Sequence, residues 1–142
     1  MARENPTVNR YLKDKAFDHI DHALGRPMWP LRESYRNYFA IGVGSELAKS
    51  FDLSPLWCLT GIQGEQAYYH VTDDGRAALA EHLAAIGSEW RPFVVSYRGF
   101  ERTIPAKSPS AARYSYFLDL SDVAPDLEFV SFATEARVRL AT

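Results

Sequence analysis

The sequence contains one cysteine, Cys58, and no apolar run of the roughly 20 residues that a membrane-spanning helix requires. A single cysteine excludes an internal disulfide, so side-chain packing must hold the fold together. Because Cys58 lies in an apolar stretch, we expect a buried, inert thiol. The N-terminus also lacks the apolar core of a signal peptide. These absences favour a protein of the reducing cytosol without a membrane partner.

Charge of neither sign dominates the chain. The 16 Lys and Arg residues and the 18 Asp and Glu residues give a formal net charge of −2, so no global attraction to nucleic acid or to an anionic membrane is expected. Residues 1–90 carry nine basic and twelve acidic residues, and residues 91–142 carry seven and six. Neither part is the strongly basic module that is typical of nucleic-acid-binding proteins.

Local patterns for catalysis are also missing. Cys58 and the four histidines form no nucleophile–base arrangement, and the acidic pair Asp73-Asp74 is explained by a helix start. One stretch would place possible metal ligands on a helical face: Asp18, His19, Asp21 and His22. An ordinary polar helix face explains this stretch better. We therefore expect no enzymatic activity, no metal and no cofactor.

The centre of the chain predicts a β-hairpin followed by a helix. Residues 56–62 and 66–71 are rich in strand formers, and glycines lie between them. Thr72 can cap a helix, two aspartates follow it, and Gly87 is a C-terminal stop. Gly75, in the first turn, is expected to permit close packing on the hairpin. An apolar stripe at helical spacing completes the pattern: Ala78, Leu79, His82, Leu83 and Ile86.

The N-terminal part predicts further helices. Asn5-Pro6 indicates a helix start, and an apolar stripe continues to Leu24 before Gly25 ends it. Residues 31–40 also predict a helix, on which Arg32 and Arg36 lie one turn apart. This pair would suit a phosphate or an acidic partner, although a solvated face paired with Glu33 is the simpler interpretation. Ser45 is expected to cap a short helix that runs through Phe51.

The C-terminal part predicts a second hairpin with one or two helices. Residues 93–97 and 100–104 read as strands around an Arg98-Gly99 turn. Ser108 or Ser110 can cap a helix that Pro125 ends. A short helix then follows near residues 127–133, and Val138 and Leu140 either continue it or form a terminal strand.

These elements predict an α+β fold: an N-terminal helix, a winged-helix-like body with a β-hairpin, and a C-terminal ββα(α) unit. The boundary falls between residues 1–88 and 89–142, and the two hairpins could pair into one sheet within a single compact domain. The expected core residues are Leu12, Ile20, Tyr38, Phe39, Leu59, Val71, Leu79, Leu83, Val95, Phe117 and Leu118.

The segment YYHVTDDGRAALAEHL resembles the wing strand and following helix of winged helix-turn-helix proteins, and segments of small phage and prophage accessory proteins. The winged-helix resemblance implies two helices within residues 31–54, the second of which, SELAKSFDLS, would be the recognition helix. It offers Lys49 and Ser50 beside Glu46 and Asp52, which is a poor set for reading a DNA groove. The C-terminal part is similar to the same phage proteins at Ala106, Ser108, Ser110, Ala112, Arg113, Tyr114, Arg137, Val138 and Arg139.

A modest basic strip is the candidate partner-binding surface: Arg98, Arg102, Lys107 and Arg113. With Tyr97, Phe100 and Tyr114 nearby, it would suit single-stranded nucleic acid. The alternative is that the aromatic residues are core and the cations solvated.

The phage resemblance implies a non-enzymatic binding protein that modulates or inhibits a bacterial host protein or nucleoprotein complex in the host cytoplasm, as anti-CRISPR inhibitors do. The alternative is a winged-helix DNA-binding transcriptional regulator.

Overall fold

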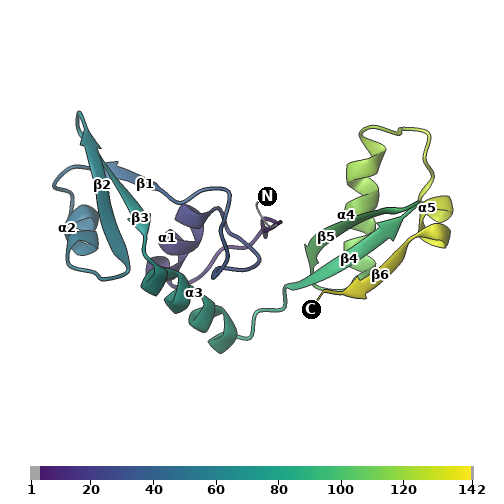
Figure 1. The fold of residues 1–142 in the computed structure, drawn as a ribbon, viewed down its shortest axis with the longest axis horizontal. Helices are drawn as coiled ribbons and strands as arrows, with labels where there is room; N and C mark the ends of the chain where they lie inside the picture. The colour runs from purple at the N-terminus through teal and green to yellow at the C-terminus, as the bar shows by residue number, and fades with distance from the viewer. Residues whose placement is uncertain (1–3, 142) are drawn as a thin grey trace. The chain divides into compact units, whose positions relative to one another are not determined.

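The protein has an α+β fold, seen in a computed structural model that describes residues 4–141 (Figure 1). These residues form two separate three-stranded antiparallel sheets. Chain contacts divide the protein into two compact units, Met1–Ser88 (unit 1) and Glu89–Thr142 (unit 2). Each predicted hairpin therefore belongs to its own sheet, and the expectation that the two hairpins pair into one sheet is wrong.

Unit 1 places its helices around a sheet of strand order β1-β3-β2. The predicted hairpin and the helix after it are confirmed. Asp14, Ser45 and Thr72 each cap a helix by accepting a hydrogen bond from a backbone N–H. The elements are α1 (Lys15–Leu24), β1 (Phe39–Gly42), α2 (Glu46–Asp52), β2 (Trp57–Gln63), β3 (Gln66–Val71) and α3 (Asp73–Ala85).

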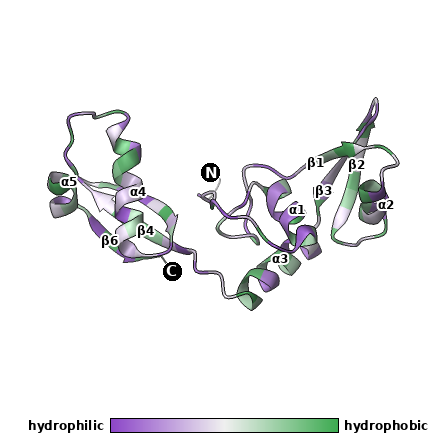
Figure 2. Cartoon of the chain, turned by 180° about the vertical axis from the view of Figure 1, so that it is seen from behind, coloured by the Kyte–Doolittle hydropathy of each residue, from purple (hydrophilic) through white to green (hydrophobic). Residues whose placement is uncertain are grey.

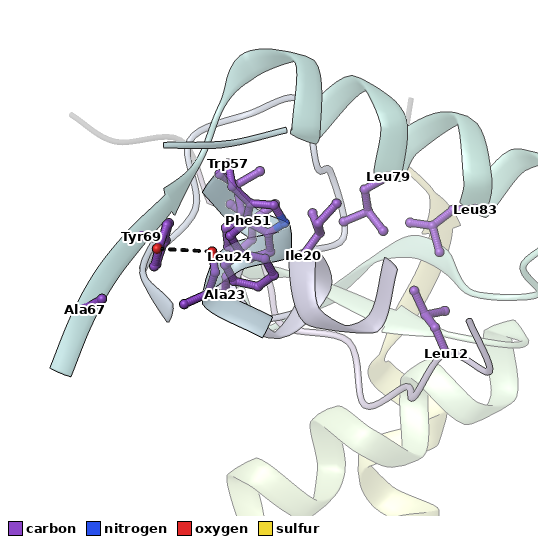
Figure 3. Close-up of a cluster of buried hydrophobic side chains, with 12 residues drawn as sticks. Leu12, Ile20, Ala23, Leu24, Phe51, Trp57, Ala67, Tyr69, Leu79 and Leu83 are labelled. Carbon is purple, nitrogen blue, oxygen red and sulfur yellow. Dashed lines mark hydrogen bonds between the residues drawn. The ribbon is translucent and has the colours of Figure 1, made fainter. Parts of the chain in front are cut away.

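The core of unit 1 joins aromatic side chains of α2 and the sheet to aliphatic side chains of α1 and α3 (Figure 3). Phe51 of α2 stacks on Trp57 of β2 with ring centroids 3.9 Å apart. Tyr69 of β3 donates from its hydroxyl to the backbone oxygen of Ala48 at 3.3 Å and to the Asp52 carboxylate at 2.8 Å. Burial, with the help of Asp52, raises the pKa of Tyr69 to about 12.

Gly75 lets α3 begin against the hairpin, as its position in the first turn predicts. A Cβ at this residue would lie 2.6 Å from the backbone oxygen of Leu56 and 2.5 Å from Cγ1 of Val71. Both distances are shorter than van der Waals contact allows. Only glycine fits this approach without displacing the backbone.

The N-terminal helix is shorter than predicted, because α1 starts at Lys15 and not near Asn5. Asn5 does not cap a helix. Its side chain instead bonds the backbone N–H and carbonyl of Trp29, each at 3.0 Å. Arg10 reaches across to Asp21, with Nη2 2.6 Å from Oδ1. The backbone of this segment pairs with residues 26–28, since the Val8 N–H donates to the Arg26 oxygen at 2.7 Å and the Met28 N–H donates to the Pro6 oxygen at 2.8 Å, so the segment before α1 is irregular.

The helix predicted over residues 31–40 is not formed. Residues 31–38 are irregular and β1 begins at Phe39. The Asn37 side chain bonds the backbone N–H of Val71 at 2.7 Å and its carbonyl at 3.0 Å. Arg76 of α3 donates to the carbonyl oxygens of Pro30 and Arg32. Of the two helices that the winged-helix resemblance implies within residues 31–54, only α2 is present.

Unit 2 has the predicted ββα(α) order and adds a terminal strand. Its elements are β4 (Arg91–Tyr97), β5 (Phe100–Ala106), α4 (Pro109–Ser121), α5 (Phe129–Glu135) and β6 (Arg137–Leu140), with strand order β5-β4-β6. Ser108 caps α4 by accepting from the N–H of Ala111. Phe132 of α5 is fully buried and contacts the rings of Tyr97, Tyr116 and Phe117. The aromatic residues of α4 and α5 thus form the centre of this unit.

Most predicted core residues are buried, and three are not. Tyr38, Leu59 and Leu118 are 44–49% exposed. Leu59 lies on β2, a strand at the sheet edge whose residues after Trp57 are all exposed. The expectation that Cys58 is buried is wrong for the same reason. Figure 2 shows hydrophobic residues on β2, although all of its residues after Trp57 are exposed. Phe39 and Phe117 are partly buried against the cores. The fully confirmed residues are Leu12, Ile20, Val71, Leu79, Leu83 and Val95.

Candidate interaction surface of unit 2

Unit 2 carries a hollow of about 600 Å³ between the β4–β5 hairpin and α4, which we call the C-terminal hollow. Its apolar lining comes from Tyr97, Phe100, Tyr116, Leu120 and Val123. Phe100 and Val123 are 72% and 81% exposed, although both are large apolar residues. Exposed apolar surface beside a concavity is typical of a site that meets another molecule.

Two of the four predicted partner-binding residues line this hollow, namely Arg98 and Arg102. Arg98 and Gly99 form the two-residue hairpin turn, and both have positive φ, at 50° and 85°. These φ values are those of a type I′ turn, whose first central position usually holds Asn, Asp or Gly, so an arginine there is unusual. Arg98 is held there by a two-bond ion pair with Glu135, at 2.9 and 3.2 Å. Its guanidinium also lies 5.1 Å from the centre of the Tyr97 ring.

The basic strip that the sequence predicts is a row of ion pairs and not an unbroken positive surface. Arg102 bonds Asp119 of α4 at 3.0 Å, and Lys107 lies 4.0 Å from Glu89. Lys107 and Arg113 are not among the residues that line the hollow. Arg113 has a buried Nε without a hydrogen-bond partner. Unit 2 contains seven basic and seven acidic residues, so its net charge is zero.

Arg98 and Glu135 stabilise each other's ionised form while both remain exposed. The neighbouring guanidinium lowers the pKa of the Glu135 carboxyl, and the carboxylate raises the pKa of Arg98, in each case chiefly through their hydrogen bonds. Both side chains remain exposed to solvent, at 63% and 46%. Because exposed pairs contribute little to stability, these charges can exchange their partner for one on another molecule at small cost.

The aromatic residues predicted beside the basic strip divide between two roles. Tyr97 is buried in the core of unit 2, whereas Phe100 is exposed at the hollow. Tyr114 is half-exposed on α4 and contacts the rings of Phe117 and Phe129. They do not form a row on one face, so the stacking platform of a single-stranded nucleic-acid site is not assembled by these three residues.

Asp18, His19 and Asp21 of α1 are engaged in structural contacts. Arg26 Nη1 bonds Asp18 at 2.7 Å and lowers its carboxyl pKa through that bond. Asp21 is fully buried and bonded to Arg10 and Arg26. His19 faces the ring of Phe39 edge-on. Within the described residues 4–141, no three histidine, cysteine, aspartate or glutamate side chains are grouped as metal ligands.

The sequence analysis missed one group on the sheet of unit 1. Cys58 on β2 lies directly opposite His70 on β3, and Thr60 Oγ1 lies 2.9 Å from His70 Nδ1. The thiol is exposed. Pairing the two strands in register would have brought these residues together, but the hairpin contains a bulge between Leu59 and Gly61 that the residue pattern does not reveal.

The candidate recognition helix α2 uses its polar residues within itself. Lys49 pairs with Glu46 at 3.3 Å, and the Ser50 hydroxyl donates to the carbonyl of Leu47 at 2.7 Å. Both residues that it would present to a DNA groove therefore already have partners on the same helix.

Comparison with known proteins finds no family model, curated protein or solved structure that matches this chain. Across residues 4–141, none of the helices combines the length and the apolar character needed to cross a membrane.

Proposed function

We propose that this chain is a non-enzymatic binding protein of the phage accessory type, which modulates a bacterial host protein or nucleoprotein complex in the cytosol by occupying a protein surface. The observation that carries the proposal is the C-terminal hollow, with Phe100 and Val123 exposed at an apolar concavity. The resemblance of two segments to small phage and prophage proteins supports the choice of a bacterial host partner.

The chemistry of the hollow favours a protein partner over nucleic acid. Its lining is mainly apolar, and the charges at its rim include both members of the Arg102–Asp119 pair. A buried apolar centre within a polar rim is the usual anatomy of a protein–protein interface. Nucleic-acid affinity depends instead on an excess of cations that neutralise phosphates, and unit 2 has equal numbers of basic and acidic residues.

The proposed contact is an apolar anchor of the partner seated in the hollow, with Phe100 packed against it. Few residues usually carry most of the binding energy, and aromatic residues at the centre of an interface are enriched among them. Phe100 should therefore matter more than the charged residues at the rim. Arg98 and Arg102 would orient the partner by exchanging their present carboxylates for carboxylates of the partner.

The experiment is affinity capture from a bacterial host lysate with wild-type protein and two variants. Phe100→Ser changes the exposed aromatic residue of the hollow. Leu53→Ser changes a leucine of unit 1 that is 88% exposed, and serves as the matched control. We expect a specific host complex to be retained by wild type and by Leu53→Ser and lost with Phe100→Ser.

A gel-shift assay on random DNA and on DNA from the gene's own operon runs in parallel. Specific retention of DNA at physiological salt, with no captured protein, would support the winged-helix regulator instead and overturn the proposal. Equal loss of the captured complex in both serine variants would also count against the hollow as the contact surface.

A further inference from the structure

Unit 1 contains a second concavity of about 310 Å³, which we call the N-terminal hollow. It is independent of the proposed protein-binding surface. It lies where the last turn of α1 meets the segment that leads into β1, and it is lined by His22, Arg36, Tyr38, Phe39 and Ala40. No carboxylate is among these lining residues, whereas two of them can carry positive charge.

The guanidinium of Arg36 is held in place, but most of its N–H donors have no hydrogen-bond acceptor. It lies 4.2 Å from the centre of the Tyr38 ring, and Nη2 donates to the backbone oxygen of Tyr38 at 3.1 Å. Nε is buried and has no hydrogen-bond partner. Within residues 4–141, Arg36 forms no ion pair. A guanidinium has five N–H donors, so most of its capacity is unused.

His22 adds a second, titratable cation to the same hollow. Its pKa is lowered, first by desolvation and then by the positive charges of Arg36 and Arg26. His19 acts in the same direction, and Asp18 acts against it. Asp18 is already bonded to Arg26 at 2.7 Å, and Asp21 is bonded to Arg10 and Arg26. The carboxylates of α1 are therefore committed elsewhere, and the hollow lacks a counter-charge.

We propose that the N-terminal hollow binds a small phosphate-type oxyanion between the guanidinium of Arg36 and the imidazolium of His22. A tetrahedral oxyanion has oxygens that can meet both cations at once, and the planar guanidinium suits two of them. Because Nε lies beneath the surface, the anion is held by the remaining N–H groups of Arg36. The sequence singled out Arg32 and Arg36 as a possible phosphate pair. The structure instead separates them, with Arg32 4.0 Å from the ring centre of Trp29.

The site predicts a particular pH dependence. The anion interacts more strongly with protonated His22, so binding must raise the pKa of His22, and affinity must increase as the pH falls through that pKa. The charges that face His22 are Arg36, Arg26, Asp18 and His19. Arg36 and Arg26 stay charged throughout the range in which a histidine titrates. Asp18 remains ionised there because Arg26 lowers its pKa. His22 is then the group whose protonation controls the affinity.

The test is a histidine NMR titration of the whole protein with sulfate, a tetrahedral oxyanion whose charge does not change between pH 5 and 8. The His22 resonance is assigned with His22→Gln. We expect sulfate to raise the pKa of His22 well beyond any change at His70, which lies on the sheet beside Thr60. Arg36→Gln should abolish the response, Arg36→Lys should retain part of it, and Arg32→Gln should leave it unchanged.

The result that would overturn the proposal is a His22 response no larger than that of His70, or equal responses in Arg36→Gln and Arg32→Gln. Since the wild-type titration alone can give the first result, the test does not depend on any variant folding. A second titration compares inorganic phosphate with glycerol 3-phosphate at one pH. Tighter binding of the ester indicates a small phosphomonoester as the natural ligand, and equal binding indicates the free anion. Both outcomes support the site.

Discussion

The two units of this protein use charged residues in opposite ways. In unit 1, Arg10 and Asp21 form an ion pair in which the residues are 7% and 0% exposed, and it ties the irregular N-terminal segment to α1. In unit 2, the pairs Arg98–Glu135, Arg102–Asp119 and Arg139–Glu101 have side chains that are all more than 40% exposed. The Arg10–Asp21 ion pair therefore links distant segments inside unit 1, whereas the three ion pairs of unit 2 lie on its surface.

The aromatic clusters at the centres of the two cores also differ. In unit 1, the rings of Phe51, Trp57 and Tyr69 contact one another and all three residues are buried. In unit 2, the aromatic cluster around Phe132 extends to the surface through Phe129, which is 38% exposed, and Tyr114, which is 51% exposed. A smaller unit buries a smaller fraction of its apolar surface. The same limitation leaves unit 2 with an apolar surface that a partner can cover.

The largest expected effect comes from removing the buried charge in unit 1. Asp21→Asn leaves Arg10 buried without a counter-charge, which should destabilise the fold by about 3–5 kcal/mol. Urea denaturation followed by tryptophan fluorescence measures the change, since the buried Trp57 reports on this core. Glu135→Gln is the matched control in unit 2, because it neutralises a carboxylate in an exposed pair. A loss below 1 kcal/mol for Asp21→Asn would mean that the buried pair does not anchor the N-terminal segment.

A core truncation comes next. Leu79 is fully buried between α3 and the rest of unit 1, so Leu79→Ala should cost about 2–5 kcal/mol. Leu83→Ala, at a residue that is 9% exposed, should fall in the lower part of that range. Leu59→Ala, on the exposed edge strand β2, should change the free energy of unfolding by less than about 0.5 kcal/mol. Equal losses at Leu79 and Leu59 would show that the edge strand is covered in solution.

A smaller loss of stability is expected from Gly75→Ala, although helix propensity alone favours alanine. Alanine is about 1 kcal/mol better than glycine in a helix interior. At position 75, however, the new methyl group would overlap the backbone oxygen of Leu56. Gly75→Ala should therefore destabilise unit 1 by about 1–3 kcal/mol, as overpacked sites do. Ala77→Gly, at an exposed position of the same helix, is the control. It should cost about 1 kcal/mol, because only helix propensity is lost there. A stabilised Gly75→Ala variant would show that the hairpin and α3 can separate without cost.

Local signals explain why much of the fold is predictable from the sequence. Thr72 and Ser108 cap helices with their own side chains, and the Arg98-Gly99 turn defines its hairpin. Residues 5–14 and 31–38 are different, because Asn5 and Asn37 bond to backbone groups 24 and 34 residues away. Local sequence patterns do not reveal partners so far away, so those segments have the residue spacing of helices without forming them.

The candidate sites follow the same rule. The sequence singled out Arg98 and Arg102 as part of a basic strip on the predicted hairpin and the helix start after it, in an otherwise acidic protein. It did not predict the C-terminal hollow, because Val123 and Asp119 come from α4 and the segment that follows it and meet the hairpin only in three dimensions. The pairing of Arg36 with His22 was missed for that reason as well. Arg36 was expected on a helix beside Arg32, and the irregular backbone of residues 31–38 turns it toward α1.

The smallest change in stability should come from breaking the Arg98–Glu135 pair, which tests whether the exposed ion pairs of unit 2 contribute little to the fold. Arg98 lowers the pKa of Glu135 below its ordinary value of about 4.5, so any stabilisation is present above that value and is lost as the pH falls through the folded-state pKa. Both side chains are exposed and screened by salt. Glu135→Gln should therefore leave the urea midpoint at pH 7 unchanged in 0.5 M salt and lower it only slightly at low salt. Even that difference should disappear as the pH falls through the lowered folded-state pKa of Glu135, because the wild-type carboxyl is then protonated as well. A large, salt-resistant loss would mean that this pair holds the hairpin turn as firmly as Asp21 holds Arg10. Its charges would then not be free to exchange with those of a partner.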